Sequence, residues 1–77
     1  MSITVKFFAT LREDLGLDVL KIEASEAADV TAVWAAATKG APMPDHALCS
    51  LNLEHVPLDA SVKDGDEVAF FPPVTGG

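Results

Sequence analysis

Hydrophobic and polar residues alternate along the first part of the chain, from Ile3 to Phe7. A period of two residues is typical of a β-strand that buries one face and exposes the other. Comparable short runs, separated by residues that favour turns, recur further along the chain. The predicted strands cover residues 3–8, residues 19–23, residues 48–53 with a turn near Asn52, a short edge strand around His55 and Val56 that stops at Pro57, and residues 67–71.

A helical period appears between the second and third of these strands. Asp29 is a favourable N-cap and Gly40 a natural stop for a helix from Val30 to about Lys39. Asp29 at the start and Lys39 at the end both complement the helix dipole. Apolar residues at i, i+3, i+4 and i+7 predict one buried stripe, formed by Val30, Val33, Trp34 and Ala37.

Shorter elements connect the strands and the helix. Thr10 and Glu13 have the spacing of a capping box, so we expect one helical turn that begins at Thr10 and ends by Gly16. The prolines of residues 41–44 predict a loop, and residues 63–66 predict a turn. A single sheet with one main helix on one face predicts the α+β class, with a β-grasp (ubiquitin-like) architecture.

Strand parity places two large aromatic residues on the open face of this sheet. If Phe7 faces the helix, Phe8 points to the opposite side, and the same argument separates Phe70 from Phe71. Single exposed apolar residues are common, but a pair of exposed aromatic residues at the base of the C-terminal tail is typical of a docking surface. His55 on the predicted edge strand is either part of the rim of this docking surface or an ordinary surface histidine.

The C-terminal residues differ from an ordinary polar terminus, and they are Pro72, Pro73, Val74, Thr75, Gly76 and Gly77. The prolines cannot extend a β-ladder and favour stiff polyproline II, whereas the glycines have no side chain and fit a narrow slot. Six residues reach at most ~20 Å, enough to carry the terminal carboxylate into another protein's active site. A frayed terminus is the alternative. We therefore divide the chain into a β-grasp domain over 1–71 and a tail over 72–77.

Composition limits the classes of function. Seventy-seven residues, 49% of them hydrophobic, make one domain with a modest core. The net charge of −7 argues against nucleic-acid binding and fits either a solvated acidic surface or a protein partner with a basic face. Cys49 is the only cysteine, which excludes an internal disulfide and suits a reducing compartment. Because no long apolar run or basic signal region is present, we expect a cytoplasmic protein without a membrane span.

No set of side chains has the pattern of a catalytic or metal site. His46 and Cys49 supply only two ligands, whereas a closed zinc site needs four, so we expect no metal and interpret Cys49 as a small buried hydrophobic residue. Neither a Ser/His/Asp set nor a glycine-rich phosphate loop is recognisable. The candidate reactive group is the α-carboxylate of Gly77, which does not react with thiols until it is activated.

The ending from Asp64 to Gly77, with its Phe-Phe-Pro-Pro-Val-Thr-Gly-Gly run, resembles the C-terminus of the MoaD/ThiS family of ubiquitin-like sulfur carriers, and especially its molybdopterin synthase small subunits. The similarity extends to residues 5–9, residues 11–13, residues 30–34 and Asn52, whereas residues 41–47 match no family pattern. Together with the right-handed crossover rule, the resemblance implies that the first and last strands lie side by side.

The resemblance implies a sulfur carrier of molybdenum cofactor biosynthesis with no permanently bound cofactor. A ubiquitin-activating-like adenylyltransferase would use ATP to adenylate Gly77, and sulfur would then replace one oxygen to give a thiocarboxylate. The tail would carry this nucleophile into the large catalytic subunit of molybdopterin synthase, within a heterotetramer. There it would attack the pterin precursor, cyclic pyranopterin monophosphate. Phe8, Phe71 and His55 would contact that subunit.

Three alternatives remain open on the residues alone. The chain could carry sulfur for thiamine or another thiolated product, since the Phe-Phe-Pro-Pro run favours the molybdenum pathway only by family likeness. It could be a protein modifier joined through Gly77 to lysines of target proteins. It could also be an interaction domain whose tail docks without acyl chemistry. The mass of the intact chain, purified with its activating enzyme, distinguishes the last from the others.

Overall fold

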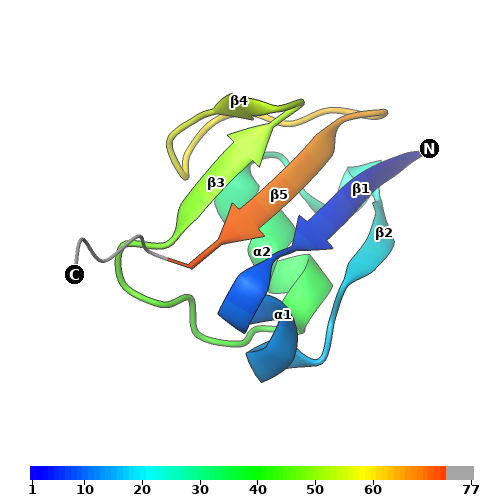
Figure 1. The fold of residues 1–77 in the computed structure, drawn as a ribbon. Helices are drawn as coiled ribbons and strands as arrows, with labels where there is room; N and C mark the ends of the chain where they lie inside the picture. The colour runs from blue at the N-terminus through cyan, green and yellow to red at the C-terminus, as the bar shows by residue number, and fades with distance from the viewer. Residues whose placement is uncertain (73–77) are drawn as a thin grey trace.

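The computed structural model describes residues 1–72, in which one mixed sheet packs against α-helices (Figure 1). Its elements are β1 (Ser2–Phe7), α1 (Ala9–Leu15), β2 (Val19–Glu23), the 3₁₀ turn η1 (Ala24–Glu26), α2 (Val30–Thr38), β3 (Leu48–Leu51), β4 (Glu54–His55) and β5 (Glu67–Phe71). The strand order is β2-β1-β5-β3-β4, and α2 lies against one face of the sheet. The predicted α+β class and β-grasp architecture are confirmed. Neither α-helix of this part of the chain has the length and hydropathy that crossing a bilayer requires.

The first and last strands form the centre of the sheet. β1 and β5 run parallel, with Val5 paired to Val68 and Phe7 paired to Phe70. β2 pairs antiparallel with the other edge of β1, and β3 pairs antiparallel with the other edge of β5. The side-by-side placement of β1 and β5 that the family resemblance implied is therefore correct. Because β5 has a neighbour on both edges, the direction in which the chain leaves Phe71 is fixed by the sheet.

The core is built around three aromatic rings between the sheet and α2. Phe70 lies 5.7 Å from Phe7 and 5.0 Å from Trp34 between ring centroids, and Phe7 lies 5.8 Å from Trp34. The Trp34 indole Nε1 donates a hydrogen bond to the Ala41 carbonyl at 2.7 Å, which ties the loop after α2 to the core. The predicted helical stripe is confirmed, since all of its members are buried: Val30, Val33, Trp34 and Ala37.

The two helices begin in different ways. Asp29 caps α2 as predicted, because its carboxylate accepts a hydrogen bond from the Ala32 backbone N–H at 2.8 Å. The capping box predicted at Thr10 is wrong: α1 begins at Ala9, its N-cap is Phe8, and no side chain caps it. The cause is the sheet, since the Phe8 N–H donates to the Phe70 carbonyl at 3.2 Å and holds Phe8 extended up to the first helical residue. The predicted end at Gly16 is confirmed by its left-handed φ of 68°.

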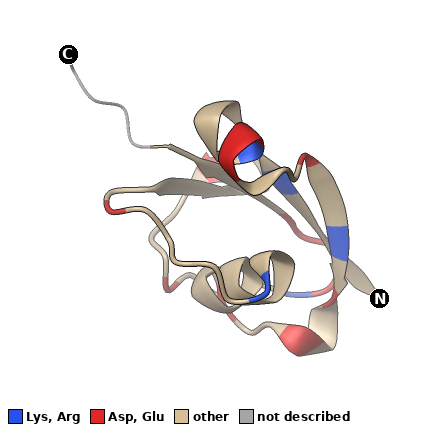
Figure 2. Ribbon diagram, turned by 90° about the horizontal axis from the view of Figure 1, so that it is seen from below, with Lys and Arg blue, Asp and Glu red and all other residues tan. Residues whose placement is uncertain are grey.

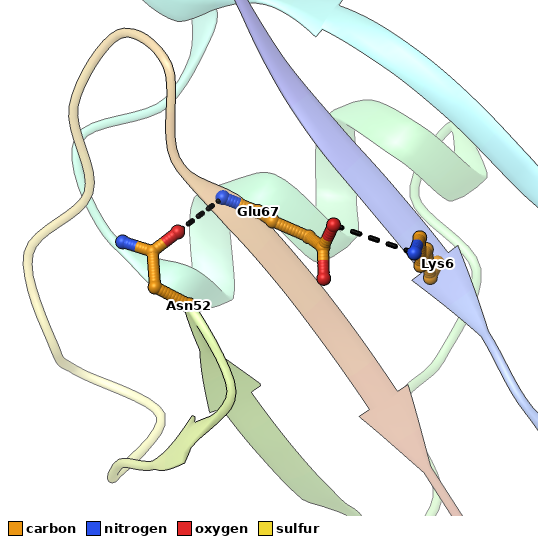
Figure 3. A network of polar contacts seen from close by, with 3 residues as sticks. All are labelled: Lys6, Asn52 and Glu67. Atoms are coloured by element: carbon orange, nitrogen blue, oxygen red, sulfur yellow. Dashed lines mark hydrogen bonds and ion pairs between the residues drawn. The ribbon is translucent and has the colours of Figure 1, made fainter.

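The third strand is shorter than predicted. β3 ends at Leu51, and Asn52 and Leu53 form a tight turn with positive φ angles of 52° and 72°. Leu53 is therefore 87% exposed and does not continue the alternation toward the core. Asn52 stabilises the turn as Figure 3 shows, because its Oδ1 accepts a hydrogen bond from the Glu67 N–H at 2.9 Å. Its Nδ2 donates to the Asp66 carboxylate at 3.0 Å, which joins the turn to the start of β5.

Candidate functional site

The two aromatic residues predicted on the open face of the sheet stack on each other. Phe8 follows β1 and Phe71 ends β5, and their ring centroids are 5.0 Å apart with an interplanar angle of 8°. Phe8 is 39% exposed and Phe71 half-buried, whereas Phe7 and Phe70 are fully buried. The strand parity inferred from the sequence is confirmed. We call Phe8 and Phe71 the aromatic patch; it lies where β5 ends and the tail begins.

The sheet register brings the patch together from distant parts of the chain. Because Phe7 pairs with Phe70 across the parallel strands, the next residue on each strand points to the opposite face beside its neighbour. On the other side of β5, Leu48 of β3 pairs with Phe71 and is 39% exposed. Leu48 thus extends the apolar surface, and our sequence analysis did not identify it. Its position beside Phe71 depends on the register between β3 and β5.

His55 lies at the edge of the patch. β4 pairs His55 with Ser50, and the imidazole centroid is 6.2 Å from the Phe71 ring. Between His55 and β1 the open face carries only small side chains, Ser50 and Ala69, which are buried among larger neighbours. The structure therefore brings Phe8, Phe71 and His55 together, and their role in binding a partner stays a prediction.

An ion pair occupies the same face next to the patch. The Lys6 ammonium lies 3.3 Å from the Glu67 carboxylate across β1 and β5 (Figure 3). Both side chains are about a third exposed, so solvent screens the pair and its contribution to stability is small. In Figure 2 acidic positions lie along helices, strands and loops with few basic ones among them, in agreement with the net charge of −7. The aromatic patch is thus an apolar area on an acidic domain.

The tail that follows the patch is described only at its first residue. Pro72 comes directly after β5 and is half-buried. The predictions made for the rest of the tail lie outside the described residues, and they concern Pro73, Val74, Thr75, Gly76 and Gly77. The boundary between domain and tail after Phe71 likewise stays a prediction, although β5 ends at that residue.

Cys49 has the environment of a structural residue. Its thiol is buried and donates a hydrogen bond to the Val56 carbonyl at 3.2 Å. Burial raises the pKa of the Cys49 thiol, which disfavours the nucleophilic thiolate. His46, the other member of the spacing considered for a metal, is exposed. Among residues 1–72 the structure holds no group of three or more His, Cys, Asp or Glu side chains arranged to bind a metal ion.

Comparison with known proteins identifies relatives over nearly the whole chain. The chain is 40% identical to the molybdopterin synthase sulfur carrier subunit of Escherichia coli and 39% identical to that of Haemophilus influenzae. Each alignment covers 97% of this chain and 99% of the relative.

Solved structures share the fold, and one of them is a complex of the two molybdopterin-converting factor subunits. SAMP1 from Haloferax volcanii superposes with a TM-score of 0.80 at 28% identity, covering 100% of both chains. A protein–protein complex of subunits 1 and 2 of the molybdopterin-converting factor from Helicobacter pylori contains a chain that superposes with a TM-score of 0.65 at 25% identity, also over 100% of both chains. The sequence matches the ThiS family over residues 5–77, and the chain therefore belongs to the ThiS family.

Proposed function

We propose that this chain is the sulfur carrier subunit of a molybdopterin synthase and that the α-carboxyl group of Gly77 is its reactive group. The observation that carries the proposal is the family match, which extends through residue 77 and so includes the terminal Gly-Gly. Relatives of this name at 39–40% identity support the molybdenum pathway over the thiamine pathway.

The chemistry requires activation by a partner. A ubiquitin-activating-like adenylyltransferase joins AMP from ATP to the Gly77 carboxyl group and releases pyrophosphate. Sulfide from the sulfur donor then displaces AMP and leaves a thiocarboxylate, whose sulfur attacks the pterin precursor in the large catalytic subunit. The described part of the chain contributes position rather than a thiol nucleophile, because its only thiol is buried with a raised pKa. ATP-dependent activation and a single reduced cysteine fit the cytoplasm.

Docking on the large subunit is assigned to the aromatic patch and His55. The stacked rings of Phe8 and Phe71 are partly exposed at the end of β5, so a partner that covers them also receives the tail. The complex of the two Helicobacter pylori subunits supports a partner of this kind. Exposed aromatic side chains of this type are typical anchors in protein interfaces.

The test is the mass of the intact chain after incubation with the adenylyltransferase, ATP and a sulfur donor. We expect one oxygen of Gly77 to be replaced by sulfur, and the product to convert the pterin precursor when the large subunit is added. A chain with one residue added after Gly77 should fold normally and form no product, while a chain with one residue added before Met1 serves as the matched control. Product formation by the C-terminally extended chain at the control's rate would refute the proposal.

A protein modifier is the second candidate. It is favoured by the similarity to SAMP1 from Haloferax volcanii, which is named a small archaeal modifier protein. The same mass measurement on lysates separates the two: attachment of the chain through Gly77 to target lysines supports a modifier, and a thiocarboxylate without attachment supports a carrier.

A further inference from the structure

A groove lies at the edge of the sheet beside the aromatic patch. Its volume is about 360 Å³, and it runs between the first residues of β3 and the segment that follows β4. The lining is mostly apolar and consists of Ala47, Leu48, Cys49, His55, Val56, Pro57 and Leu58. The function proposed above assigns no role to this groove.

The groove and the aromatic patch share residues and so form one surface. Leu48 lines the groove and also pairs with Phe71 across β3 and β5. His55 lines it from the other side, and its ring is 6.2 Å from that of Phe71. The far wall is Leu58, which is 37% exposed. A partner that covers Phe71 therefore reaches the groove without crossing a polar boundary.

The walls of the groove are held by contacts within the domain. β4 is only two residues long and pairs with Ser50 and Leu51, so the start of β3 at Leu48 is left without a β4 partner. The Leu58 carbonyl accepts hydrogen bonds from the Thr31 backbone N–H at 3.0 Å and from the Thr31 hydroxyl at 2.9 Å. These bonds attach the wall to the first turn of α2 through the backbone, so the Leu58 side chain is not needed to hold it.

Charge indicates what kind of segment the groove accepts. Residues 40–62 contain no Lys or Arg, but they contain Asp45, Glu54 and Asp59. All three carboxylates are exposed, and Asp59 follows Leu58 directly. Each of the three lies within two positions of a residue that lines the groove. An apolar groove with such acidic neighbours complements an apolar side chain with a basic residue beside it.

We propose that the groove is a second contact for the large catalytic subunit, which inserts an apolar side chain flanked by Lys or Arg. This inference rests on the proposed function and deepens it, because it extends the docking surface from the aromatic patch to Leu58. The patch sets where the tail enters the partner, and the groove adds affinity and a charge preference for that partner.

The test compares two exposed leucines, Leu58 in the wall of the groove and Leu53 in the turn after β3. Leu58→Ser removes the wall of the groove, whereas Leu53→Ser changes the hairpin turn, where Leu53 does not line the groove. In titrations of the large subunit we expect Leu58→Ser to weaken binding at least about tenfold, and Leu53→Ser to change Kd less than about twofold. Thermal unfolding of both variants checks whether the fold persists.

A charge pair of variants tests the basic neighbour and covers the case in which Leu58→Ser does not fold. Asp59→Lys should weaken binding and reduce its dependence on salt, and Asp64→Lys in the distant turn before β5 is the matched control. Equal binding by both lysine variants would overturn the charge preference.

Phe71→Ala distinguishes a failure of the groove contact from a failure of the proposed docking on the aromatic patch. If it weakens binding while folded Leu58→Ser binds as wild type, the groove contact is wrong and the proposed docking on the patch stands. If neither change weakens binding, docking on the patch fails as well. The inference would also be overturned if the chain self-associates and Leu58→Ser abolishes that self-association. A second copy of the chain would then occupy the groove.

Discussion

Two neighbouring phenylalanines on β5 should separate stability from binding. Phe70 is fully buried and contacts the rings of Phe7 and Trp34, whereas Phe71 is half-buried, stacks on Phe8 and lies 6.2 Å from the His55 ring. Replacing each in turn by Ala removes the same atoms from opposite faces of one strand. We expect Phe70→Ala to destabilise the domain and Phe71→Ala to weaken its binding to the large subunit.

The magnitudes follow from burial. Truncating a fully buried Phe costs about 3–5 kcal/mol. A domain of this size has a total stability of roughly 4–12 kcal/mol, so Phe70→Ala removes a large share of it. Phe71→Ala loses one partly exposed stack, worth about 0.5–1.5 kcal/mol, which at about 4–8 °C per kcal/mol lowers Tm by about 2–12 °C. As an interface anchor, however, Phe71 should contribute about 2 kcal/mol to binding, more than a tenfold change in Kd.

Thermal unfolding and titration with the large subunit measure the two effects on the same samples. Phe8→Ala is the matched variant for Phe71→Ala, because it removes the other ring of the same stack and should reproduce the pattern. If Phe71→Ala unfolds the domain and Phe70→Ala only loses the partner, the assignment of the two faces is wrong. If neither variant changes association, the aromatic patch is not the interface.

Three further predictions test the tail and the sheet. Gly76→Val should slow adenylation of Gly77 without lowering Tm, since a β-branched side chain widens a tip that we propose enters a narrow slot; unchanged adenylation kinetics would count against the slot. Asn52→Ala removes hydrogen bonds of 2.9 and 3.0 Å and should lower the free energy of unfolding by about 1–3 kcal/mol in urea titrations, whereas Leu53→Ala in the same turn should change it by less than about 0.5 kcal/mol. Iodoacetamide should modify Cys49 far more slowly in the folded than in the unfolded chain at pH 8, because burial raises the pKa of its thiol; equal rates would contradict the packing against Val56.

Local patterns were sufficient to predict most of the fold. The alternation from Ile3 to Phe7 and the stripe that begins at Val30 each lie within one segment, and both faces were assigned correctly. The aromatic patch was predictable for the same reason, since the residue after a buried strand position points to the opposite face. Asp29 could be predicted as a helix cap because its side chain bonds to Ala32, which is only three residues ahead in the chain.

Features that depend on pairing between strands were not predictable from local patterns. The start of α1 is set by the bond between Phe8 and the Phe70 carbonyl, which a capping pattern at Thr10 does not show. Leu53 fitted the alternation of β3, but the positive φ of the turn places it in solvent. Leu48 lies beside the aromatic patch only through its register with Phe71.

The doubled phenylalanines on β1 and β5 couple the candidate docking surface to the fold itself. Phe7 and Phe70 fill the core only when Phe8 and Phe71 stack outside it, and a slip of one residue on either strand would exchange the two faces. The terminal Gly-Gly, by contrast, is present whether or not the chain is folded. If partners dock on the aromatic patch, as we propose, they select folded chains, because segments so distant in sequence form the patch only in the native sheet. An activating enzyme that needs the patch would then adenylate folded chains and leave unfolded ones, although both carry the same carboxylate.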